Sequence, residues 1–124
     1  MIAGGAGFIG TRLSNHLNRL GHEVTVVDYF WFGDHLEPGI TKVKKDLTTL
    51  QKPDLVGFDS VIFLAGLSND PMANFDPKKN FIENAAAPTY LAYMAKQAGV
   101  PRYVYASSCS VYGFTENQIM SEDS

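Results

Sequence analysis

Three glycines at a spacing of three residues stand at the start of the chain, and they constrain its fold more than any other feature. Gly4, Gly7 and Gly10 lie between a short apolar start and a helix-like run. Glycines at this spacing are typical of a strand, a tight turn and a helix N-terminus that hold a pyrophosphate against the backbone. Gly4 can take backbone angles closed to other residues, a side chain at Gly7 would block the anion, and Gly10 lets the helix pack closely on the strand. An ordinary glycine-rich turn is the alternative interpretation.

The segment after the glycines has the context that this motif requires. Residues 11–20 are predicted to form a helix, because leucines recur there at spacings of four and three, and Gly21 ends it. Residues 22–27 then read as a β-strand that ends at Asp28. A carboxylate at this strand tip accepts hydrogen bonds from adenosine ribose hydroxyls and repels a 2′-phosphate, which favours NAD over NADP. A simple turn role for Asp28 at the end of the strand stays open.

Composition and charge exclude several other classes of protein. The 124 residues carry a formal net charge of −3, so the chain lacks the excess of basic residues that is typical of proteins that bind nucleic acid. The single cysteine, Cys109, excludes an internal disulfide and suits a reducing compartment, so we expect a cytoplasmic location. No apolar run approaches the ~18 residues of a membrane span, and no metal site is predicted. The length suggests one domain over residues 1–124.

Four consecutive aromatic residues, 29–32, follow Asp28 and precede Gly33. A surface loop rarely carries four aromatic side chains without a surface to cover. The cluster is interpreted either as a wall near the adenosine end of a cofactor or a partner-facing patch, or as a local apolar cover over the edge of the sheet.

Two later strands end in residues suited to a ligand. Residues 40–45 are predicted as a third strand followed by Asp46 and Leu47, where the carboxylate would accept the amino group of an adenine. An N-cap role for Asp46 stays equally open. Residues 60–66 form an apolar run that fits a strand buried on both faces, and its small end, Ala65 and Gly66, leaves room for a ligand. Residues 68–71 form a polar turn there, for which ligand contacts and plain turn chemistry both remain open.

Residues 77–98 are predicted to form the longest helix. Asp76 is its N-cap, Pro88 is expected to kink it, and Gly99 ends it. Two apolar stripes suggest one face on the sheet and another against a partner helix, with a single wide core face as the alternative. The first stripe is Phe81, Ala85, Pro88, Ala92 and Ala95, and the second is Ile82, Ala86, Tyr90 and Tyr93.

A fifth strand, residues 101–106, leads into the stretch Ser-Ser-Cys-Ser-Val-Tyr-Gly at 107–113. The alternation of strands and helices predicts an α/β fold, a doubly wound parallel sheet of the Rossmann type. Ligands of such sheets bind outside the carboxyl ends of the strands, where the candidate residues above all fall.

With the serine stretch included, the sequence resembles the extended short-chain dehydrogenase/reductases. The resemblance is to the NAD-dependent nucleotide-sugar epimerases and dehydratases, of which UDP-glucose 4-epimerase is the nearest familiar member. The matching segments, in family order, are residues 4–10, 26–28, 46–47, 63–67, Asn84 and 107–113.

This resemblance implies NAD as cofactor and a role for each matching residue. Gly4, Gly7, Phe8, Ile9 and Gly10 would bind the pyrophosphate, Asp28 the adenosine ribose, Asp46 and Leu47 the adenine, and Leu64, Ala65 and Gly66 the middle of the cofactor, with Asn84 bracing the pocket and Ser107 beside it. Ser108, four residues before Tyr112, matches the catalytic Ser/Thr that orients a sugar hydroxyl. Tyr112 matches a structural Val-Tyr-Gly motif and not the catalytic tyrosine.

The sequence also departs from the family pattern at both ends. Ala3 stands where the family usually has threonine, and only Met1 to Ala3 precede the first glycine, so the glycine turn is expected to be the least supported part of its site. No Tyr-x-x-x-Lys, the family's base and its lysine, occurs in the 124 residues. We therefore expect a Rossmann domain truncated after its fifth strand, without the sugar-binding lobe, that binds NAD at best and turns over essentially no sugar.

Three interpretations of function follow. The chain is part of a nucleotide-sugar epimerase or dehydratase, a non-catalytic NAD-binding module, or one half of a split enzyme. Ser108 favours the first and third, because a pure binder has no use for it. The resemblance further implies a nucleotide-sugar substrate and a homodimer through residues 77–98.

Overall fold

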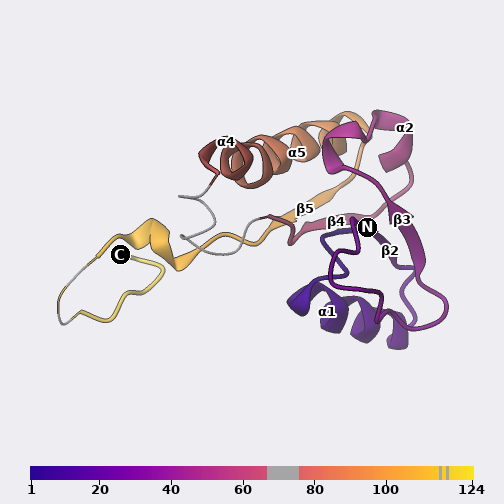
Figure 1. Ribbon diagram of the computed structural model, residues 1–124, viewed down its shortest axis with the longest axis horizontal. Helices are drawn as coiled ribbons and strands as arrows, with labels where there is room; N and C mark the ends of the chain where they lie inside the picture. Colours follow the sequence, from indigo (N-terminus) through magenta and orange to yellow (C-terminus); the bar gives the residue numbers. More distant parts are fainter. Residues whose placement is uncertain (67–75, 115, 117) are drawn as a thin grey trace.

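Five short strands form one sheet in which every pair of neighbours is parallel (Figure 1). The computed structural model describes residues 1–66, 76–114, 116 and 118–124. The strands are β1 (Ile2–Ala3), β2 (Thr25–Asp28), β3 (Thr41–Lys44), β4 (Ser60–Phe63) and β5 (Arg102–Tyr105). Their spatial order is β3-β2-β1-β4-β5, which is the Rossmann order.

Helices cover both faces of this sheet, as a doubly wound fold requires (Figure 1). On one side lies α1 (Phe8–Arg19), and on the other lie α2 (Lys52–Leu55), α4 (Pro77–Phe81) and α5 (Ala87–Gln97). Two 3₁₀ turns, η1 (Leu47–Thr49) and η3 (Cys109–Tyr112), follow β3 and β5. Within the ranges that the structure describes, no helix has the length and apolar character needed to cross a membrane.

Each face of the sheet has its own apolar core. Successive side chains of a strand point to opposite faces, so Ile2 and Val26 join the cluster on the α1 side, whereas Ala3 and Val27 join the cluster on the α5 side. The two residues of β1 are the centre of the sheet and are 2% and 0% exposed. The first strand is therefore very short, yet it is fully packed.

Several helices and strands begin or end at other residues than predicted. The first helix begins at Phe8, inside the glycine motif, and β2 begins at Thr25. The fourth strand ends at Phe63, so residues 64–66 already belong to the connection at its carboxyl end. Residues 52–54, for which no helix was predicted, belong to the helical turn α2, because Gln51 and Asp54 form a capping box and proline is tolerated in a first turn.

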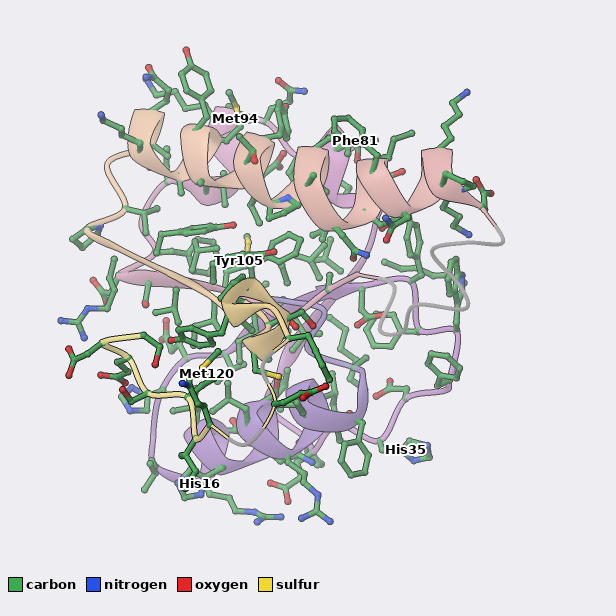
Figure 2. The ribbon with its side chains drawn as sticks, turned by 90° about the vertical axis from the view of Figure 1, so that its left-hand side faces the viewer. His16, His35, Phe81, Met94, Tyr105 and Met120 are labelled. Atoms are coloured by element: carbon green, nitrogen blue, oxygen red, sulfur yellow. The ribbon has the colours of Figure 1, made fainter. Side chains whose placement is uncertain are left out.

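The long helix is interrupted just before Pro88 by a π-helical segment, η2 (Ile82–Ala86). Proline has no N–H for the carbonyl four residues earlier, which is that of Asn84, and its ring crowds that carbonyl. The Tyr105 hydroxyl donates a hydrogen bond to the Asn84 carbonyl at 3.4 Å, and Figure 2 shows Tyr105 below the helical layer that carries Phe81. The helix thus has a π segment next to the proline at which a kink was predicted.

This segment also shifts the buried face of the helix. A π turn adds a residue to the helical repeat, and the buried face of α5 runs through Ala87, Leu91 and Ala95. Phe81, a predicted member of the first stripe, is 63% exposed, and Ala85 is exposed as well. The first predicted stripe is therefore wrong in its N-terminal half.

Candidate functional site

A cleft opens where the strand order reverses, at the carboxyl ends of β1 and β4, which is where sheets of this type bind ligands. The two strands are joined there by the hydrogen bond from the Leu64 N–H to the Ala3 carbonyl, at 2.8 Å. The cleft is lined by Gly4, Gly7, Val27, Asp28, Tyr29, Trp31, Phe32, Lys45, Leu47, Leu64, Ala65, Gly66 and Glu83. Seven of the predicted cofactor residues are therefore brought together: Gly4, Gly7, Asp28, Leu47, Leu64, Ala65 and Gly66.

The three glycines of the motif differ in what requires them. Gly4 has a φ of +80°, and a Cβ on it would lie 2.5 Å from the Ala65 nitrogen. A Cβ on Gly10 would overlap the Gly4 carbonyl oxygen and lie 2.7 Å from the Cα of Gly5. Among the residues that the structure describes, a Cβ on Gly7 would meet only the Gly4 oxygen, at an ordinary 3.6 Å. Packing within the chain therefore requires glycine at positions 4 and 10. At position 7 there is room for a side chain, and Gly7 lines the cleft.

The glycine turn is well supported, contrary to the expectation from Ala3 and the short strand. The Gly4 N–H donates to the Val27 carbonyl at 2.9 Å, and the Ala6 N–H donates to Asp28 Oδ2 at 3.0 Å. Ser14, fully buried on α1, donates from its hydroxyl to the Gly5 carbonyl at 3.2 Å. Ser14 was missed by sequence reasoning, although a lone serine on the buried face of an amphipathic helix was the available signal.

Asp28 joins the glycine turn to the loop after β2. While Oδ2 accepts from Ala6, Oδ1 accepts from the Phe30 N–H at 2.9 Å. Asp28 therefore has the turn role that was left open, and it also lines the cleft. An ionised carboxylate has about four lone-pair directions, so two backbone donors leave acceptor capacity for a ligand.

The N-terminus of α1 faces the glycine turn through backbone alone. Gly7 is its N-cap and offers no side-chain cap, and the first turn holds no acidic residue. The Phe8 and Ile9 side chains are apolar and 84% and 65% exposed, so these residues can offer an anion only their backbone N–H groups. The first N–H groups of a helix have no acceptor within it and lie at the positive end of its dipole, an arrangement that suits a phosphate.

Asp46 is the N-cap of η1, so this alternative is confirmed. Its carboxylate accepts from the Thr48 N–H at 2.9 Å and the Thr48 hydroxyl at 2.7 Å, and these bonds lower the pKa of Asp46. The pKa of Tyr29 is raised mainly by burial and further by the nearby carboxylate of Asp46. Leu47 lines the cleft, whereas Asp46 does not.

The aromatic cluster divides between the two predicted interpretations. Tyr29, Trp31 and Phe32 line the cleft, and the Tyr29 and Trp31 rings stack at 5.1 Å with 10° between their planes. Phe30 instead packs against the core on the α1 side.

Two charged residues of the cleft, Lys45 and Glu83, were missed by sequence reasoning. Burial and the negative charge of Asp46 raise the pKa of Glu83, while Lys79 opposes that shift. The available signal was their position, since each directly precedes a residue of the predicted site, Asp46 and Asn84.

Asn84 packs against the connection that follows β4. Gly66 has a φ of +132°, and a Cβ there would overlap the Asn84 side-chain oxygen. The Asn84 amide donates to Asn80 Oδ1 at 2.7 Å. Asn84 thus lies next to Gly66, which lines the cleft. Residues 68–71, the predicted polar turn, lie outside the described residues.

The serine stretch follows β5 at the same edge of the sheet but stands apart from the cleft. Ser107 and Ser108 are exposed, and neither lines the cleft. Ser108 is the N-cap of η3, where its Oγ accepts from the Ser110 N–H at 3.1 Å and lies 3.0 Å from the Ser110 Oγ. Figure 1 shows η3 beyond the end of β5, on the opposite side of the sheet from β3.

Comparisons with known proteins agree with this architecture. The chain is 33% identical over 127 residues to UDP-glucuronic acid decarboxylase 1 of Danio rerio, covering 99% of the chain and 30% of that protein. It is 28% identical over 139 residues to UDP-glucose 4-epimerase of Bacillus subtilis, covering 99% of the chain and 40% of that protein. The chain therefore spans less than half the length of these relatives.

Among solved structures, MoeE5 in complex with UDP-glucose and NAD superposes with a TM-score of 0.86 at 32% identity, over 99% of this chain and 40% of that one. The family model for the NAD dependent epimerase/dehydratase family matches residues 1–124. The predicted resemblance is confirmed, and the chain belongs to the NAD-dependent epimerase/dehydratase family.

Proposed function

We propose that this chain binds NAD in the cleft between β1 and β4 and forms the cofactor site of a nucleotide-sugar epimerase or dehydratase. The observation that carries the proposal is Gly7, the one glycine of the motif that the packing of the chain does not require. An open position at the N-cap of α1, in front of unpaired N–H groups, fits a pyrophosphate. The solved relative that holds NAD and UDP-glucose supports the same cofactor.

Each end of the cofactor has its own set of residues in this proposal. Gly4, Gly7, Phe8, Ile9 and Gly10 bind the pyrophosphate through backbone, Asp28 binds the adenosine ribose, and Leu64, Ala65 and Gly66 bind the middle. Leu47 lies at the adenine side, where Asp46 supports it as the N-cap of η1. Asn84 supports Gly66, and Ser107 joins the site only if the serine stretch comes closer to the cleft than it lies here. The free lone pairs of Asp28 accept the ribose hydroxyls and repel a 2′-phosphate, so NAD is bound more tightly than NADP.

Ser108 is the proposed catalytic residue of this chain. Its hydroxyl would hydrogen-bond a sugar hydroxyl and orient it for loss of a proton. NAD, when bound, supplies a reversible hydride acceptor for the sugar carbon. These 124 residues offer no Tyr-x-x-x-Lys to take the proton, and the loss of a general base commonly costs about 10²–10⁴ in rate. We therefore expect the chain by itself to bind NAD without turning over sugar.

Two measurements on the purified chain test this proposal. Isothermal titration with NAD should show one site, with weaker binding of NADP, and incubation with NAD and UDP-glucose or UDP-galactose should show no epimerisation. A titration without binding heat contradicts the proposed cofactor site. Epimerisation by the chain alone contradicts the proposal that the chain binds NAD without turning over sugar.

A non-catalytic NAD-binding module or one half of a split enzyme is the second candidate. The exposed position of Ser108, outside the cleft, favours it. A pull-down from the source cell separates the two forms, because a split enzyme requires a partner that carries Tyr-x-x-x-Lys.

We also propose a homodimer through the helical segment 77–98, as the family resemblance implies. The exposed Phe81, Ile82 and Tyr93 on this segment support it. Light scattering of the purified chain gives the molar mass directly, and a monomer at micromolar concentration contradicts the proposal. The proposed cytoplasmic location is tested by cell fractionation.

A further inference from the structure

The loop after Asp28 is held in a strained conformation. Among the described residues, Phe30 is the one non-glycine residue with positive φ, at +60°, and a bulky side chain rarely adopts this region. Its N–H donates to Asp28 Oδ1 at 2.9 Å, its carbonyl accepts from the Gly33 N–H at 3.2 Å, and its ring packs against the core on the α1 side. Strain of this kind persists only where the surroundings fix it, and it is concentrated at ligand sites.

This loop conformation places the Trp31 ring at the cleft, with another ring packed against one of its faces. Tyr29 stacks on it at 5.1 Å with nearly parallel planes, and the Asp46 carboxylate lies close enough to the Tyr29 hydroxyl to add to the rise of its pKa. Trp31 is nevertheless 60% exposed. A large apolar ring that is backed on one side and open on the other is a surface prepared for contact.

Within the part of the chain that the structure describes, a lysine lies over the other face of Trp31. The Lys79 ammonium, from α4, lies 4.6 Å from the centre of the indole ring. An ammonium group does not fit between two parallel rings at a spacing of 5.1 Å, so Lys79 lies on the face opposite Tyr29. An exposed cation–π contact is weaker than the stacking of a nucleobase on an aromatic ring, and a lysine side chain is readily displaced.

We propose that the adenine base of the dinucleotide stacks on the face of Trp31 that Lys79 now covers. The base takes the place of the lysine, between Trp31 and α4. This inference rests on the proposed function, because it assigns the adenine end of the same cleft. Its location agrees with Leu47, which lines the cleft beside the Asp46–Tyr29 pair.

The test uses the fact that Trp31 is the single tryptophan of the chain. Its fluorescence therefore reports on one ring. AMP and NAD should both change the emission in a saturable way, whereas nicotinamide mononucleotide, which has the phosphate and ribose without adenine, should leave it unchanged. An equal response to nicotinamide mononucleotide and AMP overturns the proposal.

Variants of two neighbouring rings make the test specific. Trp31→Ala should weaken the calorimetric affinity for AMP and NAD by about 5- to 100-fold, the range expected for one base–aromatic stack, and Trp31→Phe should restore most of it. Phe32→Ala is the matched control, because Phe32 also lines the cleft and is 84% exposed. It should change the affinity less than Trp31→Ala, and the reverse order overturns the proposal.

Failure of this inference is distinguishable from failure of the proposed function. If the wild-type chain binds NAD by calorimetry and Trp31→Ala binds it equally well, the adenine lies elsewhere and the cofactor site stands. If the wild-type chain binds neither NAD nor AMP, the proposed function itself is wrong. The unfolding midpoint of each variant in urea shows that a lost affinity is not a lost fold.

Discussion

The glycine turn after β1 and the serine stretch after β5 stand at the same edge of one sheet, yet they are held in opposite ways. The turn is fixed by distant parts of the chain: Val27 and Asp28 bond to its backbone, and Ser14 bonds to it from inside α1. The serine stretch is exposed, and Ser108 bonds to Ser110, two residues away.

The difference separates binding from chemistry within one chain. A site for an anionic cofactor consists of backbone N–H groups and shape, which the fold of these residues already provides. Proton transfer needs side chains placed within hydrogen-bond distance of a reacting atom, and the serine stretch does not reach the cleft. We infer that the cofactor end of the site is preorganised in the chain itself, whereas the catalytic end is not.

The largest expected effect comes from adding a methyl group inside the turn. A Cβ at residue 10 overlaps backbone atoms of Gly4 and Gly5, which cannot move without disturbing β1. Gly10→Ala should lower the free energy of unfolding by about 3 kcal/mol or more, at the upper end for overpacking. Urea denaturation followed by circular dichroism measures it. A variant as stable as the wild type would show that the turn is looser than described.

A smaller effect is expected where the turn meets the loop after β2. Asp28→Asn retains one acceptor oxygen and faces the other backbone donor with an NH₂ group, so either Ala6 or Phe30 loses its partner. An unsatisfied partly buried donor costs about 1–3 kcal/mol, measurable in the same urea titration. Preference for NAD over NADP should decrease as well. Unchanged stability and unchanged preference together would contradict the dual role of Asp28.

Two serine substitutions compare the regions most directly. Ser14→Ala removes the buried hydrogen bond to Gly5 and should cost about 1 kcal/mol. Ser108→Ala removes only an exposed local cap and should change the free energy of unfolding by less than about 0.5 kcal/mol. Equal losses in the two variants would remove the distinction between the turn and the serine stretch.

The smallest effect concerns pH and the α4 side of the cleft. Because burial raises the pKa of Glu83, its carboxylate is less favourable in the folded chain than in the unfolded one. The neutral form contributes stability that is present at low pH and lost as the pH rises through the folded pKa. Glu83→Gln should therefore be slightly more stable than the wild type at pH 7, with the difference vanishing below about pH 4. A difference that grows on acidification contradicts this sign.

Much of the fold follows from local sequence. Period-two and apolar patterns identified the strands and the long helices, and Gly4 and Gly10 are required for the reasons expected, because close backbone approach is encoded by the residue itself. Interactions between distant segments were not accessible in this way. Ser14 acts on Gly5 and Asp28 on Ala6 across the fold, and nothing in the local sequence says which backbone group a buried serine will meet.

In the candidate site, too, local motifs were predictable from the sequence and contributions from distant segments were not. The residues carried by motifs, such as Gly7, Asp28 and Ala65, do line one cleft, whereas Lys45 and Glu83 enter it from elements whose register sequence patterns do not fix. The helix containing Glu83 illustrates the reason, since the π segment before Pro88 changes which residues face inward. Asp46 fits two roles on local chemistry alone, and the hydrogen bonds to Thr48 decide for the N-cap.

The central claim is that the glycine turn is prepared for a pyrophosphate, and Gly7 tests it most directly. Because a Cβ at residue 7 meets only an ordinary contact among the described residues, Gly7→Ala should lower the free energy of unfolding by no more than about 1 kcal/mol, the cost of an alanine at the N-cap of α1, while blocking the ligand. Isothermal titration of wild type and variant with NAD is the measurement. The account predicts one site in the wild type and at least a roughly 10-fold weaker affinity in the variant, about 1.4 kcal/mol. Equal affinities in two folded proteins would contradict it.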